Sequence, residues 1–393
     1  MRFMNSPLHQ VTMKDVARFC GVGGSTVQRA LSDDPRVKAS TKKRILAAAQ
    51  ELGYNPAHHE AARRMVLRRQ GRDITNYTVG LLMPLAFEEV PYFFRIFQGL
   101  INIFASKGYA VVTFSFGTDF HPNPVSLPSV FFRGEIDGLI LIGHPKDTMP
   151  FITQLRNDSG FGPQRPMISM INIIPEIGSV TTDDVSGAYE ATKHLLDLGH
   201  KNILQLTLFN FGKLDERQKG ITKALLDAGL SPEKHLHFLE MSDYKETEGW
   251  LEPATLTDVS RYVSSYQSIN KDFSHPLLDV LKKNPETSAI LALNDACAIQ
   301  AWSVLQQAGL KVPDDISIIG FDDVEQSITL DGQLGLTTVR LPLVDIGRSA
   351  AEHMIAAIQS HNPSHEMISL PTQLIVRSTT SSAKNDTIAL HQK

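Results

Sequence analysis

The sequence predicts an all-α helix-turn-helix head at the amino terminus, followed by an α/β body made of two doubly wound parallel-sheet lobes. Three observations favour this fold class: a compact three-helix pattern between Val11 and Tyr54, a basic excess in residues 1–72, and alternating strand-like and helix-like segments from Thr78 onward. A chain of 393 residues is too long for one ordinary core and suits two to three domains.

The head begins with a helix that Thr12 and Asp15 can cap, because their side chains are spaced to satisfy backbone N–H groups at its first turn. A glycine-rich turn then leads into a second helix with an apolar inner face. Ser40 or Thr41 opens a third helix, which buttresses the first two. A second helix held in this way can lie in a DNA major groove. Its outward side chains are Ser25, Thr26, Gln28 and Arg29.

The charge distribution favours the same interpretation. Residues 1–72 contain 14 Lys and Arg against five Asp and Glu, whereas the rest of the chain contains 24 basic and 37 acidic residues. A single basic cluster is usually a solvated surface. An excess that coincides with a helix-turn-helix instead matches the footprint needed to neutralise phosphates and release counterions. The sequence therefore predicts binding to nucleic acid.

Cysteine usage and hydropathy predict a cytoplasmic protein. Cys20 and Cys297 both lie in apolar helical patterns, so we expect buried thiols in a reducing compartment rather than a disulfide. No metal-ligand spacing surrounds them, and we expect no cofactor. No apolar run follows the first residues as in a signal peptide, and no segment approaches 18 uninterrupted apolar residues, so we expect no membrane partner.

A basic segment over residues 57–73 links the two parts. It can form a helix but has too few apolar residues to bury itself. Two interpretations stay open: a plain flexible linker, or a hinge that becomes helical only on DNA and inserts a side chain into the minor groove. A metal site at His58 and His59 is improbable, because adjacent histidines cannot easily share one helical face.

The body shows a repeated strand–helix cycle, which predicts parallel sheets with ligands beyond the carboxyl ends of the strands. About 315 residues are too many for one such sheet, so we expect two similar lobes with a cleft between them. The expected strands lie at 79–83, 110–114, 138–142, 167–171, 203–206, 289–293 and 316–320, and the expected helices at 92–107, 187–198, 216–228 and 296–308.

Several short motifs, in their order and spacing, resemble the LacI/GalR (lactose-repressor) family of transcription regulators. In the head they are Met13-Lys14-Asp15-Val16-Ala17, Thr26-Val27-Gln28-Arg29-Ala30-Leu31 and Glu51-Leu52-Gly53-Tyr54-Asn55-Pro56. In the body they are Leu198-Gly199-His200, Glu216-Arg217 with Gly220, Asn294-Asp295, Gly309-Leu310-Lys311-Val312-Pro313, Gly320-Phe321-Asp322-Asp323 and Leu336-Thr337-Thr338-Val339-Arg340.

The resemblance implies a homodimer that reads a palindromic operator, with lobes of periplasmic-binding-protein type holding a small effector between them. The expected boundaries are 1–57 for the head, 58–77 for the hinge and 78–393 for the effector-binding and dimerisation body. Within the body, we place lobe 1 at about 78–182 and 311–342, and lobe 2 at about 183–310 and 343–380.

For DNA contacts, the resemblance places the major-groove readers on Gly24 and Ser25. Gly24 has no side chain, so the glycines of the turn can instead ease a close approach to phosphates. Base contacts would then depend on Ser25, Gln28 and Arg29. Gln pairs with adenine and Arg with guanine. Met65 is the candidate wedge, with Leu67 as the alternative, and Tyr54 either contacts the DNA backbone or packs on the third helix. The full set is Thr12, Gly24, Ser25, Thr26, Gln28, Arg29, Tyr54, Arg63 and Met65.

For the effector, the resemblance indicates five residues, of which Arg217 and Asp295 match the family's pattern best. Sugar hydroxyls can donate to a carboxylate and accept from a guanidinium, and a structural Arg217–Asp295 bridge is the alternative. Residues 241–276 form either a lid or a surface insertion. The five expected residues are Tyr92 and Phe93, which can stack on a ligand or simply pack, and Asn172, Arg217 and Asp295.

We therefore predict a repressor of carbohydrate-utilisation genes, controlled by a sugar-like effector. A purine or nucleoside effector is the alternative, since similar lobes can hold a base between aromatic faces. A solute-binding receptor of similar architecture would need an export signal and no basic head. We expect no enzyme, because the sequence shows no nucleophile–base constellation or phosphate loop, and adjacent Asp322 and Asp323 would point to opposite sides of a strand end.

Overall fold

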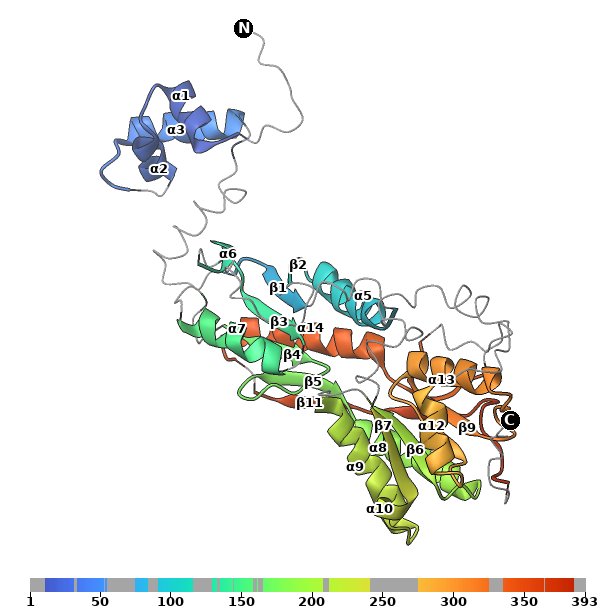
Figure 1. The fold of residues 1–393 in the computed structure, drawn as a ribbon. Helices are drawn as coiled ribbons and strands as arrows, with labels where there is room; N and C mark the ends of the chain where they lie inside the picture. Colours follow the sequence, from blue (N-terminus) through green and yellow to red (C-terminus); the bar gives the residue numbers. More distant parts are fainter. Residues whose placement is uncertain are drawn as a thin grey trace. The chain divides into compact units, whose positions relative to one another are not determined.

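The computed structural model consists of two compact units, residues 1–75 and 76–393 (Figure 1). Among the described residues, no helix is both long and apolar enough to cross a membrane. The residues that the structure describes are 11–31, 34–52, 54, 75–83, 91–115, 129–132, 135–143, 145–157, 161, 165–207, 212–240, 275–324, 335–363 and 365–384.

The first unit contains the predicted helix-turn-helix, formed by α1 (Met13–Cys20), α2 (Gly24–Leu31) and α3 (Ala39–Glu51). The capping box is present, and the Asp15 carboxylate accepts from Thr12 N at 2.9 Å. Gly21 ends α1 with a φ of 63°, a left-handed conformation that favours glycine. The three helices share one buried core, made of Val16, Ala17, Val27, Ala30, Ile45, Ala49 and Tyr54.

The body contains two six-stranded sheets, and all strands of the first are parallel. Most of its interior strands are buried along their whole length, as expected for a parallel sheet covered on both faces. Its strand order is β11 (Met367–Leu370), β5 (Gly178–Thr182), β4 (Met167–Met170), β3 (Gly138–Ile142), β1 (Thr78–Met83) and β2 (Ala110–Ser115).

The second sheet repeats the arrangement of the first, with β12 as its single antiparallel strand. In each sheet the second strand along the chain lies beside the first, and the third, fourth and fifth follow on the other side. The order is β12 (Gln373–Ile375), β10 (Thr337–Arg340), β9 (Ser317–Asp322), β8 (Ala289–Leu291), β6 (Ile203–Thr207) and β7 (Leu236–Glu240).

Helices cover both faces of each sheet, so the predicted doubly wound fold is confirmed. The first sheet lies between α5 (Pro91–Ser106) with α14 (Leu343–Ser360), and α6 (Ser129–Phe132) with α7 (Pro145–Asn157). The second lies between α8 (Asp184–Asp197) with α9 (Gly212–Asp227), and α12 (Pro276–Lys283) with α13 (Asp295–Gln307). A short helix, α10 (Pro232–His235), precedes β7.

The expected division of the later chain between the lobes was wrong. Residues 311–342, which we had assigned to lobe 1, supply β9 and β10 of the second sheet. Helix α14, which we had assigned to lobe 2, packs against α5, β3 and β4 of the first. Helix α14 joins the first lobe because it packs very closely against α5. A Cβ atom added at Gly99 or at Gly347 would overlap backbone atoms of the facing helix, so this close contact requires glycine at both positions.

Candidate DNA-reading surface and effector site

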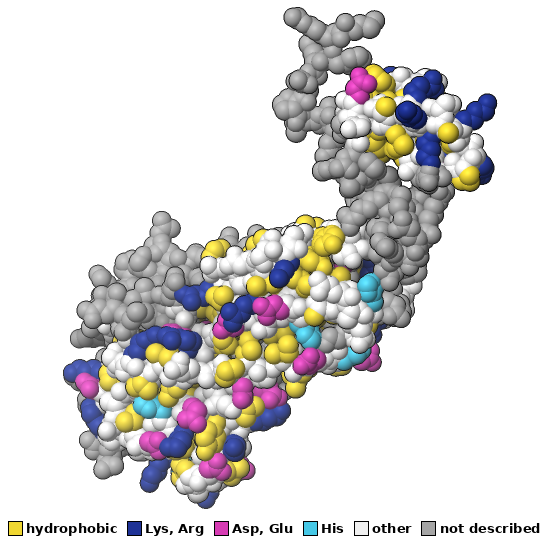
Figure 2. All heavy atoms as spheres, turned by 180° about the vertical axis from the view of Figure 1, so that it is seen from behind, with side chains coloured by type: hydrophobic (Ala, Val, Ile, Leu, Met, Phe, Trp, Pro, Cys, Tyr) yellow, Lys and Arg dark blue, Asp and Glu magenta, His cyan; other side chains and the backbone are white. Residues whose placement is uncertain are grey.

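Helix α2 presents the expected DNA-contacting side chains. Val27 and Ala30 are buried against the head core, whereas Ser25 and Arg29 are exposed and Gln28 is half-buried. Figure 2 shows basic side chains gathered on the visible face of the head, whereas the body surface mixes both signs. The acidic residues of the head are partly neutralised, since Asp15 and Asp34 form ion pairs with arginines at 3.3 and 2.7 Å.

Two positions in the head bear on the alternatives left open by the sequence. A Cβ added at Gly24 would meet nothing within 4 Å, so the fold itself does not require glycine there. The Tyr54 ring is 5% exposed within the head core, which supports packing as its role, and burial raises the pKa of its hydroxyl. The hinge candidates Arg63, Met65 and Leu67 lie outside the described residues.

Four of the five expected effector residues, all but Asn172, lie in helices that follow strands meeting at the switch point of each sheet. Strands β6 and β8 are neighbours in the second sheet, and α9 and α13 follow them; strands β1 and β3 are the equivalent neighbours in the first sheet, and α5 follows β1. Open α/β sheets bind ligands in the crevice beyond these strand ends. Tyr92, Arg217 and Asp295 therefore lie in helices that follow the strands at these switch points.

Arg217 lies in α9, with its side chain only 10% exposed. Its Nε donates to the Asp184 carboxylate at 2.9 Å, its Nη1 donates to the Leu293 carbonyl, and its guanidinium carbon lies 3.6 Å from the centroid of the Phe321 ring. Gly220, one turn further along α9, sets this position. An added Cβ at Gly220 would overlap the backbone of α8, so glycine allows the two helices to approach.

The partner of Arg217 is Asp184 and not Asp295, so the expected alternative of an Arg217–Asp295 bridge was wrong. Asp184 is 2% exposed and begins α8, where it also accepts a hydrogen bond from the Thr182 hydroxyl. Asp184 was not among the site residues predicted from the sequence. The available signal was an Asp shortly after an expected strand and at the start of a helix, a position that Asp295 shares.

Asp295 is held by neighbours of its own lobe. It is 1% exposed and accepts from the Thr338 hydroxyl at 2.5 Å and from Val324 N at 3.2 Å. An added Cβ at Gly320 would overlap the Asp295 carboxylate, which explains the glycine in β9. Asn172 lies at the carboxyl end of the first sheet, where its amide donates to the Gly143 carbonyl at 3.2 Å.

Tyr92 and Phe93 begin α5, and their rings pack edge to face with centroids 4.9 Å apart. Burial raises the pKa of Tyr92 well above its usual range, and the carboxylates of Asp322 and Asp184 raise it further, whereas Arg217 opposes them. The Tyr92 hydroxyl of the first lobe therefore lies within electrostatic reach of the Arg217–Asp184 pair of the second. Of the predicted effector residues, Tyr92 and Arg217 are the two that this interaction relates across the lobes.

Asp322 and Asp323 do not form a paired-carboxylate centre. Both have positive φ angles, 117° and 52°, and they face different partners. Asp323 accepts from Arg340 and Arg377 at 2.6 Å each, whereas Asp322 lies near Tyr92 and contributes to its raised pKa. Among the residues described, no group of three or more His, Cys, Asp or Glu side chains could hold a metal ion.

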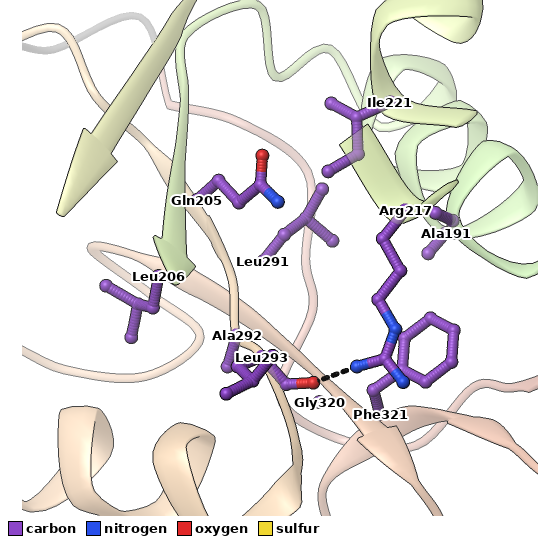
Figure 3. A pocket seen from close by; sticks show the side chains of 11 residues that line it. Ala191, Gln205, Leu206, Arg217, Ile221, Leu291, Ala292, Leu293, Gly320 and Phe321 are labelled. Atoms are coloured by element: carbon purple, nitrogen blue, oxygen red, sulfur yellow. Dashed lines mark hydrogen bonds between the residues drawn. The ribbon is translucent and has the colours of Figure 1, made fainter. Parts of the chain in front are cut away.

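Figure 3 shows a small pocket between the second sheet and helices α8 and α9, with Arg217 and Phe321 at one end. Its volume of about 20 Å³ is close to what a single water requires. The lining residues are Ala188, Ala191, Gln205, Leu206, Arg217, Ile221, Leu291, Ala292, Leu293, Gly320 and Phe321.

A helical DNA-reading head joined to a two-lobed, doubly wound body defines the class of ligand-responsive DNA-binding regulators. Residues 12–57 match the family described as bacterial regulatory proteins, lacI family. Residues 76–252 match periplasmic binding proteins and sugar binding domain of LacI family, and residues 192–380 match a periplasmic binding protein-like domain. The chain belongs to the lacI family of DNA-binding transcription regulators.

Similar proteins agree with this assignment along almost the whole chain. The HTH-type transcriptional repressor PurR of Aliivibrio fischeri is 27% identical over 379 residues, covering 94% of this chain and 98% of the relative. A CelR–cellobiose complex has a TM-score of 0.58 at 22% identity and covers 94% of this chain and 99% of that one. A lac repressor dimer bound to operator and the anti-inducer ONPF has a TM-score of 0.59 at 20% identity, with coverages of 95% and 100%.

Proposed function

We propose that this protein is a homodimeric repressor whose affinity for a palindromic operator is set by a small polar effector bound between the lobes. The observation that carries the proposal is the junction of a basic helix-turn-helix with a buried Arg217–Asp184 pair at the ligand-binding edge of the body. A dimer places two α2 helices about one DNA turn apart, which matches two half-sites. The similarity to the repressor PurR supports repression as the direction of control.

On DNA, the head is proposed to supply two kinds of contact. The half-buried Gln28 and the exposed Arg29 of α2 would read base edges, while Thr12 before α1 and Thr26 in the first turn of α2 would contact phosphates. Lys43 on α3 adds an exposed cation that is suited to a phosphate. The residues of the hinge, including Arg63 and Met65, are proposed to add minor-groove contacts.

The effector is proposed to be a sugar or sugar derivative. Arg217 and Asp184 together offer hydrogen-bond donors and acceptors that hydroxyl groups can satisfy in a buried site. Tyr92 on the opposite lobe supplies a further hydroxyl, and Asn172 and Asp295 lie beyond the carboxyl ends of β4 and β8. The family description of residues 76–252, which names a sugar binding domain, supports this choice.

A purine or nucleoside is the second candidate. The rings of Tyr92, Phe93 and Phe321 lie at or near the site and offer faces on which a flat base can stack. A nucleoside would also bring ribose hydroxyls to the Arg217–Asp184 pair. The similarity to the repressor PurR is a further reason to test this class alongside sugars.

The test is selection of duplexes from a random library by the purified full-length protein, followed by titration with ribose, cellobiose, adenosine and cytidine. We expect a palindromic site, affinity that falls steeply with salt, and a several-fold change in operator affinity with one compound. Gln28→Ala should relax the preference at one base position per half-site, whereas Lys43→Ala should weaken all duplexes alike. Binding without any sequence preference would contradict the proposal.

A further inference from the structure

Gln205 is a polar residue in the middle of a buried strand. Along β6, Leu204 and Leu206 face the cluster that includes α12 and α13, and Ile203 faces the cluster that includes α8 and α9. Alternation places Gln205 on the same side as Ile203, where it is only 4% exposed. Strands buried on both faces are otherwise nearly continuous runs of apolar residues. A glutamine at this position therefore needs a physical reason.

The amide oxygen of Gln205 is buried and has no hydrogen-bond partner among the described residues. Burying such a group without a partner is unfavourable, and most buried polar atoms in proteins are paired. In Figure 3 the amide lies apart from the Arg217 guanidinium, whose donors are directed to Asp184 and Leu293. The nearby cation is therefore occupied elsewhere, and the Gln205 side chain lines the pocket described above.

The pocket connects Gln205 to the effector site. Its lining runs from Leu293, just beyond the end of β8, past Arg217 and inward to Gln205 in β6. Ala188 and Ala191 line it on the α8 side, and their short side chains leave the space that larger residues would fill. At about 20 Å³, the pocket has room for one small group and not for a whole sugar.

We propose that Gln205 forms the inner end of the effector site, where its amide oxygen accepts a hydrogen bond from a single hydroxyl-bearing group of the ligand. The group is neutral, because an ammonium there would lie in apolar surroundings close to the Arg217 guanidinium. It enters when Arg217 moves away from Leu293. This subsite rests on the proposed function, because it extends the same effector site.

The first experiment compares the unliganded stability of two near-isosteric variants of the full-length protein. Gln205→Met removes an unpartnered amide, so we expect the melting temperature to rise, by about 2–4 °C. Thr192→Val is the matched control on the neighbouring helix α8, since its buried hydroxyl donates to the Ala188 carbonyl at 2.7 Å. We expect Thr192→Val to lower the melting temperature. An unchanged or lower value for Gln205→Met would overturn the subsite.

The second experiment measures binding of ribose, cellobiose, adenosine and cytidine by calorimetry. For a compound that binds, we expect Gln205→Met to lower the binding affinity at least about tenfold. Removing one hydroxyl from the ligand should lower the affinity of the wild type by as much, but should hardly change the affinity of the variant. Equal binding to both proteins would overturn the subsite and leave the proposed function intact. If no compound bound the wild type, the effector class in the proposed function would fail, and the melting comparison would still decide the subsite.

Discussion

The buried pair of Arg217 and Asp184 is the strongest electrostatic feature at the residue scale. Both side chains are at most 10% exposed, so each charge depends on the other for compensation. The Phe321 ring covers one face of the guanidinium, and the Leu293 carbonyl accepts a second hydrogen bond from it. A ligand hydroxyl can accept the hydrogen bond that Arg217 now donates to the Leu293 carbonyl. The contacts that hold Arg217 in place can therefore be replaced by contacts with a ligand.

Asp184→Asn tests the strength of this pair. The change leaves Arg217 buried without a counter-charge, so we expect the free energy of unfolding to fall by about 3 kcal/mol. The measurement is urea denaturation of the full-length protein. Asp197→Asn on the same helix is the control, because its partner Lys193 is half exposed and the pair should contribute little. Equal losses in the two variants would contradict the special role of the buried pair.

Single residues were predictable from the sequence where a short motif matches the family pattern. Arg217 and Asp295 were predicted from the Glu216-Arg217 and Asn294-Asp295 motifs of the family resemblance, and both lie in helices that follow neighbouring strands of the second sheet. Their partners could not be predicted in the same way. Arg217 pairs with Asp184 because Gly220 draws α9 against α8, and this approach depends on tertiary packing that no local pattern records.

At the scale of elements, the most regular segments were predicted well and the less regular ones were not. The expected helix at 92–107 is α5, and the expected strand at 138–142 is β3. By contrast, α14 was not identified, and its lobe was assigned wrongly. Periodicity shows that a helix has an apolar face, but not which sheet covers that face. The choice depends here on the paired glycines of α5 and α14.

Gly347→Ala tests the contact between α5 and α14. The new methyl group would overlap the Ile96 carbonyl, so the helices must separate, and we expect a loss of about 3 kcal/mol or more in unfolding free energy. The measurement is the urea unfolding midpoint. Ser349→Ala in the same helix serves as the control, because alanine favours helix and Ser349 is half-buried. A Gly347→Ala protein as stable as the wild type would contradict the packing argument.

His275 makes the second lobe sensitive to acid through helix α12. Its Nδ1 accepts a hydrogen bond from Leu277 N at 3.1 Å, so the neutral imidazole caps the helix. Burial lowers the pKa of His275 from 6.5 to about 4. Between these values the unfolded chain binds a proton that the folded protein does not, so stability falls as the pH drops from about 6.5 toward 4.

We expect this histidine to account for a loss of about 1–2 kcal/mol between pH 7 and pH 5. His275→Asn keeps a good N-cap and removes the titration, so its unfolding free energy should depend less on pH over this range. The measurement is urea unfolding of both proteins at the two pH values. Identical pH dependence would show that His275 is not the titrating group.

At the scale of the whole molecule, the body consists of two similar lobes, and the chain crosses from one lobe to the other three times. The crossings follow β5, β10 and β11, and two of them are bonded to each other: Asp183 N donates to the Leu370 carbonyl at 2.8 Å, and the Thr372 hydroxyl donates to Asp183 at 3.1 Å. Short, bonded crossings concentrate any lobe motion in a few residues. A ligand between the lobes can therefore change the orientation of one lobe relative to the other without unfolding either lobe.

The last prediction joins the body to the head. Arg217→Ala should leave operator affinity and its salt dependence unchanged, because phosphate contacts belong to the head. Effector control should disappear: a ligand that shifts wild-type operator affinity by roughly 5- to 150-fold should shift the variant by less than about twofold. Fluorescence anisotropy with a labelled operator measures both quantities.

Arg217→Ala also leaves Asp184 buried without its cation, so the double variant Asp184→Asn/Arg217→Ala, which lacks both charges, separates lost stability from lost binding. Arg156→Ala removes an arginine from a partly exposed pair on the same body and is the control for total charge. A double variant that folds, binds operator and still responds fully to the ligand would place the effector somewhere other than at Arg217. Loss of the response together with intact DNA binding would locate the coupling at this arginine, since a ligand shifts an equilibrium only by its different affinity for the two states.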